Sequence, residues 1–127
     1  MMEPMAEYSF TARDGQVEVR RDDRMAWVGR IHDVAALDAF SLPGSEDGIV
    51  VLDWMDEPEG VQAWQPYRNL LRVGPDGTEI WRADLPGGEK SFTKAGWEEG
   101  SLIACTWTHR CVVDPGTGHL METTVTG

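Results

Sequence analysis

Apolar and polar residues alternate in short stretches through most of the chain. Residues 15–22 (GQVEVRRD) and 25–31 (MAWVGRI) alternate with a period of two around Asp22 and Asp23, which is typical of two strands joined by a tight turn. The apolar run GIVVLDWM, which begins at Gly48, is rich in β-branched residues and suits a strand that is buried on both faces. The pattern therefore predicts a mainly β protein.

The second half of the chain has the same character. From Asn69 onward, apolar stretches alternate with turn residues such as Gly, Pro, Asp and Ser. Strands are expected near residues 69–73, 78–83, 91–96, 102–108, 110–113 and 119–125.

One segment departs from the β pattern. Asp33 precedes the Ala- and Leu-rich run VAALDAF, and an Asp in that position is a common N-cap signal. Val34, Leu37 and Phe40 would share one face of a helix. We therefore expect one short helix at about residues 33–41.

Two turns of similar composition close hairpins in the second half. In GPDG (residues 74–77), Pro favours the φ of a type I turn, and the final glycine can adopt the positive φ of a closing bulge. In DPGTG (residues 114–118), the Asp114 carboxylate can accept hydrogen bonds from backbone N–H groups two or three residues later. Pro75 and Pro115 lie 40 residues apart, a period typical of β-propeller blades.

The stretch DPGTGHLM, and less closely GPDGTEIW, resembles the quinoprotein-type β-propeller repeat. In that repeat such a turn is followed by an apolar strand containing Trp. The resemblance covers roughly the second half of the chain and implies two blade-like hairpins in a curled antiparallel sheet. A closed propeller needs about four to eight blades. The cofactor that such enzymes bind in a central channel is therefore not expected here.

Length and composition fit a single folded domain over residues 1–127. A chain of 127 residues, 41% of them hydrophobic, can bury a core without disulfides or metals. The hairpin and the helix are expected within residues 1–64, and the β repeat within residues 65–127.

Cysteine usage and the absence of a signal bear on the cellular compartment. No basic region followed by an apolar run starts the chain, and no stretch approaches the length of a membrane span. Cys105 and Cys111, if they share one strand, are about 20 Å apart at roughly 3.3 Å per residue, too far for a disulfide. Reduced thiols, with nine arginines to two lysines, predict a bacterial cytoplasmic protein. Its oligomeric state is left open.

The net charge of −11 argues against binding to a nucleic-acid backbone. Residues 1–64 carry 14 acidic residues and five arginines, whereas residues 65–127 carry eight acidic and six basic residues. The stretch 46–59 contains six acidic residues and no basic one. Two interpretations stay open: a solvated face, or a docking surface for a basic protein partner.

Aromatic residues flank the acidic loop, and Trp, Tyr and Arg dominate binding hot spots. We expect a non-catalytic binding protein, of which an immunity protein or an inhibitor is one form. Its expected partner-binding residues are Asp53, Trp54, Asp56, Glu57, Glu59, Trp64, Tyr67 and Arg68. The alternative is a small-ligand or carbohydrate site built from Trp54 and Trp64. A hydrolase that uses the carboxylates ranks third. Trp81 and Trp107 lie in clear strand patterns and are expected in the core.

Motifs that identify catalytic and metal sites are absent. The sequence contains no Gly-x-Ser-x-Gly, phosphate loop, dinucleotide fingerprint, His-Glu-x-x-His or paired Cys-x-x-Cys. If residues 102–113 form one strand, His109 and Cys111 share a face, and His119 can approach from the next strand. A core face with two buried thiols explains the same spacing. We therefore expect no catalytic residue, no metal and no cofactor.

Overall fold

The computed structural model describes residues 7–53 and 66–126, and within these ranges it contains strands and turns but no helix. No described segment can therefore cross a membrane as a helix. The strands are β1 (Tyr8–Arg13), β2 (Gln16–Arg21), β3 (Arg24–Gly29), β4 (Ala36–Ser41), β5 (Gly48–Leu52), β6 (Leu70–Val73), β7 (Glu79–Arg82), β8 (Lys94–Glu98), β9 (Ser101–Cys105), β10 (His109–Val113) and β11 (Leu120–Val125). The prediction of a mainly β protein is confirmed.

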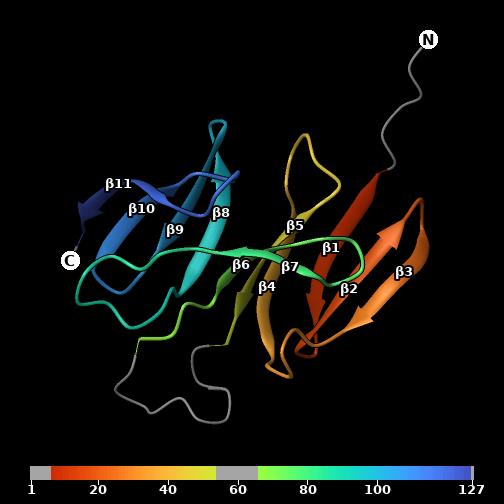
Figure 1. Ribbon diagram of the computed structural model, residues 1–127. Coiled ribbons are helices and arrows are strands. Elements are labelled where there is room, and N and C mark those ends of the chain that lie inside the picture. The colour runs from red at the N-terminus through yellow and green to blue at the C-terminus, as the bar shows by residue number, and fades with distance from the viewer. Residues whose placement is uncertain (1–6, 54–65, 127) are drawn as a thin grey trace.

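The strands form three antiparallel sheets in which neighbours in sequence are also neighbours in space. The first sheet is β1–β2–β3, the central sheet is β4–β5–β6–β7, and the third sheet is β8–β9–β10–β11. Figure 1 shows them side by side, with the central sheet between the other two. The predicted meander is thus divided over three packed sheets.

The central sheet is covered on both faces, which explains the continuous apolar run of β5. Side chains alternate along a strand, so Val50 and Leu52 pack against the first sheet, in one core cluster. Ile49 and Val51 face the other way and pack against the third sheet, in a second cluster. All five residues of β5 are buried.

The first and central sheets meet along β1 and β4. The Ser41 hydroxyl accepts a hydrogen bond from the Phe10 N–H (3.2 Å) and donates to the Tyr8 carbonyl (3.0 Å). The Phe10 ring lies directly over Gly48, where a Cβ would come within 2.3 Å of the ring. Glycine at position 48 therefore permits the close approach of the two sheets.

A tryptophan from the preceding sheet packs against the turn of each of the two similar hairpins. Trp27 of β3 packs on Gly77 in the turn between β6 and β7, and Trp81 of β7 packs on Gly118 in the turn between β10 and β11. The Trp81 indole N–H also donates to the Pro115 carbonyl (2.9 Å). Both hairpins are paired antiparallel as predicted. The repeated turn thus supplies a glycine on which a large ring of the neighbouring sheet can lie.

The helix predicted at residues 33–41 is wrong. Asp33 lies in a turn at positive φ, and residues 36–41 form β4, which pairs with β5. A bulge at Leu37 brings Ala36 and Ala39 to the same buried face of the strand. These residues are three positions apart, which is the spacing expected of one face of a helix. Pairing with the buried strand β5 overrides the helical preference of Ala and Leu.

Two strands are present as predicted from residue 102 to residue 113, but the first, expected to reach residue 108, ends at Cys105. A turn at residues 106–108 separates β9 from β10, so residues 102–113 do not form the unbroken strand on which the grouping of His109 and Cys111 depended. Trp107 lies in that turn and is 70% exposed, contrary to the expectation that it is a core residue, whereas Trp81 is buried as expected. Cys105 and Cys111 are both free, as predicted. They lie on neighbouring strands, and their side chains point to opposite faces of the third sheet.

Candidate functional site

Part of the predicted binding surface can be located in the structure. Trp54, Asp56, Glu57, Glu59 and Trp64 lie outside the described residues. Tyr67 is buried in the core between the first and central sheets. Arg68 donates to the Arg82 carbonyl (2.7 Å) and the Ala83 carbonyl (3.1 Å), and the Asp53 N–H donates to the carbonyl of residue 35 (2.8 Å). These contacts are internal, and a binding role for these residues stays a prediction.

The three candidate metal ligands do not converge. Cys111 faces the core, His109 lies beside Glu89, and His119 lies beside Asp84, with Nδ1 2.9 Å from the carboxylate. No group of three or more potential ligands comes together anywhere in residues 7–53 and 66–126. The turn at residues 106–108 changes the register on which the predicted grouping depended.

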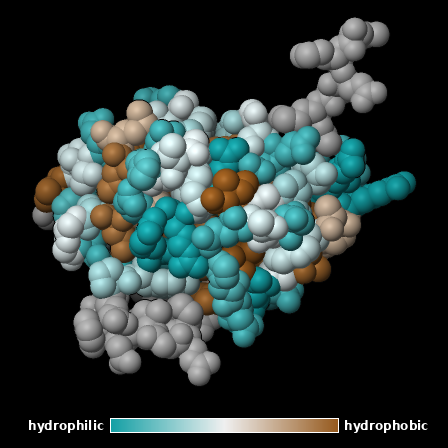
Figure 2. All heavy atoms as spheres, in the orientation of Figure 1, coloured by the Kyte–Doolittle hydropathy of each residue, from teal (hydrophilic) through white to brown (hydrophobic). Residues whose placement is uncertain are grey.

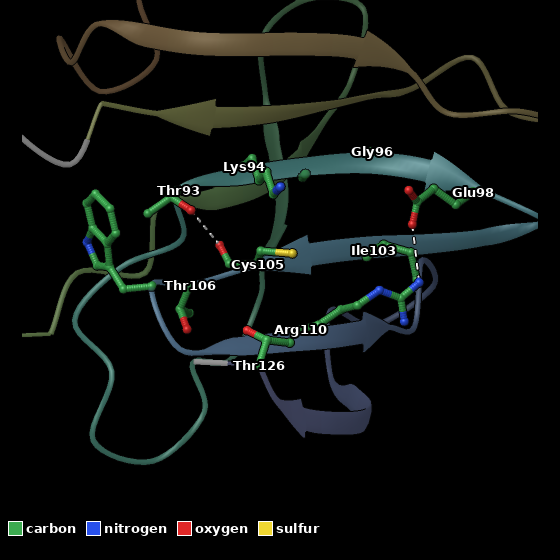
Figure 3. A pocket seen from close by; sticks show the side chains of 11 residues that line it. Thr93, Lys94, Gly96, Glu98, Ile103, Cys105, Thr106, Arg110 and Thr126 are labelled. Atoms are coloured by element: carbon green, nitrogen blue, oxygen red, sulfur yellow. Dashed lines mark hydrogen bonds and ion pairs between the residues drawn. The ribbon is translucent and has the colours of Figure 1, made fainter.

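A hollow lies on the outer face of the third sheet, the face directed away from the central sheet (Figure 3). Its volume is about 610 Å³. The residues that line it are Thr93, Lys94, Ala95, Gly96, Glu98, Ile103, Cys105, Thr106, Trp107, Arg110 and Thr126. We call it the outer-face hollow.

A row of three side chains crosses this hollow. Cys105 of β9 pairs with Lys94 of β8 on one side and with Arg110 of β10 on the other. Residues directly opposite one another in a sheet share a face, so the partly exposed Cys105 lies between two basic residues on the outer face. The Arg110 side chain extends along the sheet toward Glu98 (Figure 3). An Arg110 Nη2 lies 3.2 Å from a Glu98 carboxylate oxygen. Lys94 has no ion-pair partner in the part of the chain that the structure describes.

The next row provides an apolar floor. Ile103 of β9 pairs with Gly96 of β8, and Ile103 is only 6% exposed although it is on the outer face. A Cβ at Gly96 would have no atom within 4 Å. The missing side chain at Gly96 therefore leaves open space beside Ile103.

Trp107 is held at the rim of the hollow by a carboxylate from a distant loop. Glu89 accepts hydrogen bonds from the hydroxyls of Thr106 and Thr108 and from the Thr108 N–H (3.2 Å). The Nδ1 atom of His109 lies 3.1 Å from the same oxygen. These hydrogen bonds, with that of Thr106 the largest contribution, lower the pKa of Glu89 to about 2. Glu89 thus fixes the turn that carries Trp107.

We expect Glu89→Gln to destabilise the protein at pH 7 by on the order of 1 kcal/mol, because charge-assisted hydrogen bonds become neutral ones. The folded-state pKa of Glu89 lies below its ordinary value of 4.5. Its contribution is therefore complete above pH 4.5 and is lost as the pH falls toward about 2. Urea unfolding from pH 7 to pH 2.5 should show the difference from wild type shrinking.

Glu98→Gln is the matched control for this measurement, because its ion pair is exposed on the same sheet. Exposed pairs contribute little to stability. Equal stability of Glu89→Gln and wild type at neutral pH would show that Glu89 does not hold the turn.

A second hollow, of about 460 Å³, lies between the turn at residues 22–23 and the loop that follows β4. Its lining includes the carboxylates of Glu7, Asp22 and Asp23 and no basic side chain. Ser41, which ties β1 to β4, forms part of its wall. We call it the acidic hollow. Much of the visible surface is hydrophilic, and hydrophobic side chains appear on it as separate patches (Figure 2).

The fold defines an all-β protein of three packed antiparallel sheets with hollows on its surface. Residues 30–125 match the family described as Domain of unknown function (DUF7957), and the chain belongs to this family. No curated protein and no solved structure matches the chain. The family description assigns no activity.

Sequence reasoning missed both hollows. A glycine inside a strand pattern, as at Gly96, often marks a place where another group approaches the backbone closely, and this was the available signal for the outer-face hollow. The acidic hollow joins residues from three separate segments, so no local motif marks it.

Proposed function

We propose that this protein is a non-catalytic binding protein whose acidic surface docks a positively charged segment of another protein. The observation that supports the proposal is the acidic hollow, which three carboxylates line without a basic side chain. Such a surface attracts a basic partner over distances of roughly 8–10 Å at physiological salt and gives association its speed and specificity.

The distribution of ion pairs favours this side of the molecule. In the central and third sheets, Arg72 pairs with Asp47, Arg82 with Glu79 and Arg110 with Glu98. By contrast, no ion pair within the described residues involves Glu7, Asp22 or Asp23. Arg21 lies over the ring of Tyr8, a residue that lines the acidic hollow, 5.8 Å from the ring centre, and it forms no ion pair with these carboxylates. The carboxylates of the acidic hollow are therefore available to an external cation.

The test removes charge without disturbing the backbone. Asp22 and Asp23 have positive φ values of 48° and 70°, which Asn adopts about as readily as Asp. We expect the double variant D22N/D23N to weaken binding of a fluorescein-labelled peptide rich in lysine and arginine by about five- to tenfold. Fluorescence anisotropy at low and at physiological salt measures the affinity.

The double variant D14N/D33N is the matched control. Asp14 and Asp33 also lie in turns at positive φ and carry the same two charges, but they do not line the acidic hollow. If both double variants lose affinity equally, the peptide responds only to net charge and the acidic hollow is not a docking site.

A quadruple variant, in which Asp53, Asp56, Glu57 and Glu59 are replaced by Asn or Gln, tests the stretch predicted from sequence. If only this variant loses affinity for the peptide, the docking surface lies at that stretch and not at the acidic hollow.

A further inference from the structure

The outer-face hollow lies on a different sheet from the acidic hollow and has the opposite charge character. Its central row places Lys94 and Arg110 on either side of Cys105, on three neighbouring strands. Adjacent strands are about 4.8 Å apart, so the two cations stand roughly 10 Å apart at their backbones. Both have long side chains that can converge on one small anion above the thiol.

The basic side chains of this face can still bind such an anion. Glu98 contacts one nitrogen of Arg110, and exposed pairs of this kind are weak. A guanidinium carries five N–H donors, so Arg110 can bind a second carboxylate. Lys94, which is exposed, has no anionic partner among the described residues. In a chain with a net charge of −11, two cations in one hollow are a local exception.

The same hollow offers apolar contact next to the cations. Ile103 forms the floor, the absent side chain of Gly96 leaves room above it, and Trp107 stands at the rim. Three threonines, Thr93, Thr106 and Thr126, also line the hollow. The hydroxyls of Thr93 and Thr106 donate to the Cys105 carbonyl and to Glu89, respectively. A volume of about 610 Å³ is within the range of small-molecule sites, which combine an apolar lining with a few polar groups.

We propose that the outer-face hollow binds a small carboxylate with an apolar, aromatic body. The carboxylate lies between Lys94 and Arg110, over the Cys105 thiol. The aromatic body occupies the space beside Gly96 and contacts Ile103. The positive charges of Lys94 and Arg110 select a negatively charged ligand. The space left by the missing side chain at Gly96 determines where the aromatic body lies.

Cys105 provides a reporter inside the site. It is partly exposed, whereas Cys111 is fully buried, and burial raises the pKa of the Cys111 thiol. Iodoacetamide, a small uncharged reagent, should therefore alkylate the native protein at Cys105, and peptide mass spectrometry measures the rate at each cysteine separately. The probe is 2-naphthoate, and its uncharged analogue 2-naphthamide is the comparison. The protection factor, the rate without the probe divided by the rate with it, cancels any change in the intrinsic reactivity of the thiol.

We expect 2-naphthoate to slow alkylation of Cys105 with saturation, and to bind about fivefold or more tightly than 2-naphthamide, because it alone forms charged hydrogen bonds. Lys94→Gln and Arg110→Gln should each reduce the affinity for 2-naphthoate and leave that for 2-naphthamide unchanged. Gly96→Val should remove protection by both probes, because it fills the space beside Ile103. It should not lower the melting temperature, because the position is open and Val favours a strand.

Arg13→Gln is the matched control. It removes the same charge from β1, on the first sheet, and should protect like wild type. Equal protection by 2-naphthoate and 2-naphthamide would show an apolar patch without a carboxylate site. Protection by 2-naphthoate that is equally strong in Lys94→Gln and Arg110→Gln, or no protection in the wild-type protein, would also overturn the proposal.

Discussion

Asn69→Asp should lower the free energy of unfolding at pH 7 by about 3–5 kcal/mol. Asn69 is fully buried, and its side-chain N–H groups donate to the carbonyls of Leu52 (2.8 Å) and Phe92 (2.7 Å). Its side-chain oxygen accepts from the Phe92 N–H (2.7 Å). Asp has the same shape, but it places a carboxylate oxygen where the two N–H donors were. The carbonyls of Leu52 and Phe92 then lose their donors and face a buried negative charge. Asn69 joins the central sheet to the segment before β8, and the substitution acts on both.

Urea unfolding at pH 7 and pH 4 checks this prediction. Burial raises the folded-state pKa of the introduced carboxyl, so its cost is complete above that pKa and decreases as the pH falls toward the unfolded value of about 4. The loss should therefore be smaller at pH 4. Asn69→Ala is the control, because it leaves the Leu52 and Phe92 groups unpaired at either pH. A loss below about 1 kcal/mol for Asn69→Asp would mean that water replaces these hydrogen bonds.

Gly118→Ala and Gly77→Ala should each cost roughly 2–4 kcal/mol. Both glycines have positive φ, +81° and +82°, which costs Ala about 1 kcal/mol. At both positions the added Cβ would also lie 2.6 Å from a ring atom, of Trp81 or of Trp27. The ring and the neighbouring sheet must move to relieve this overlap, and overpacking of this kind costs about 1–3 kcal/mol.

Gly88→Ala and Gly100→Ala separate the two contributions. These glycines have the same backbone conformation, with φ of +84° and +80°, but a Cβ at either position would have no atom within 4 Å. They should therefore lose only the conformational part, about 1 kcal/mol. Equal losses for Gly77, Gly118 and the two controls would show that the tryptophans do not hold the sheets together at these turns.

A double-mutant cycle with Trp81→Leu tests the contact directly. In the Trp81→Leu background, Gly118→Ala should cost less than in the wild-type protein, because a smaller side chain can make room for the Cβ. The difference between the two costs is the coupling between the ring and the turn.

The sequence by itself determined the strands whose stability is local. Alternation predicted β2 and β3, the apolar run predicted β5, and turn residues predicted the hairpins of the central and third sheets. Pro75 and Gly77 specify their turn through their own backbone preferences. Signals of this kind act within a few residues, so they can be read without the fold. The strand β1 was not predicted, although it pairs with the neighbouring strand β2; hydrogen bonds of the Ser41 side chain also tie it to the distant β4.

For the candidate sites, the sequence determined the acidic character of the first half but not which carboxylates are neutralised. The acidic stretch has no base nearby in the sequence, yet Asp47 is paired with Arg72, 2.8 Å away, from another strand. The row Lys94–Cys105–Arg110 depends on the register of three strands. A change of one residue in register would turn a side chain to the other face, so this site exists only in the folded sheet.

Only the tertiary structure decided the two segments that were predicted wrongly. Residues 36–41 are a strand because β5 offers them hydrogen-bond partners. A bulge at Leu37 interrupts the alternation of buried and exposed residues that would have identified this strand in the sequence. Residues 106–108 form a turn, although the β-branched and aromatic sequence TWT suits a strand, because Glu89 accepts hydrogen bonds from them. In both segments the local preference is worth less than the pairing of backbone and hydroxyl groups with partners that are distant in the sequence. Local residues set the preference, and hydrogen-bond partners that are distant in the sequence decided the outcome.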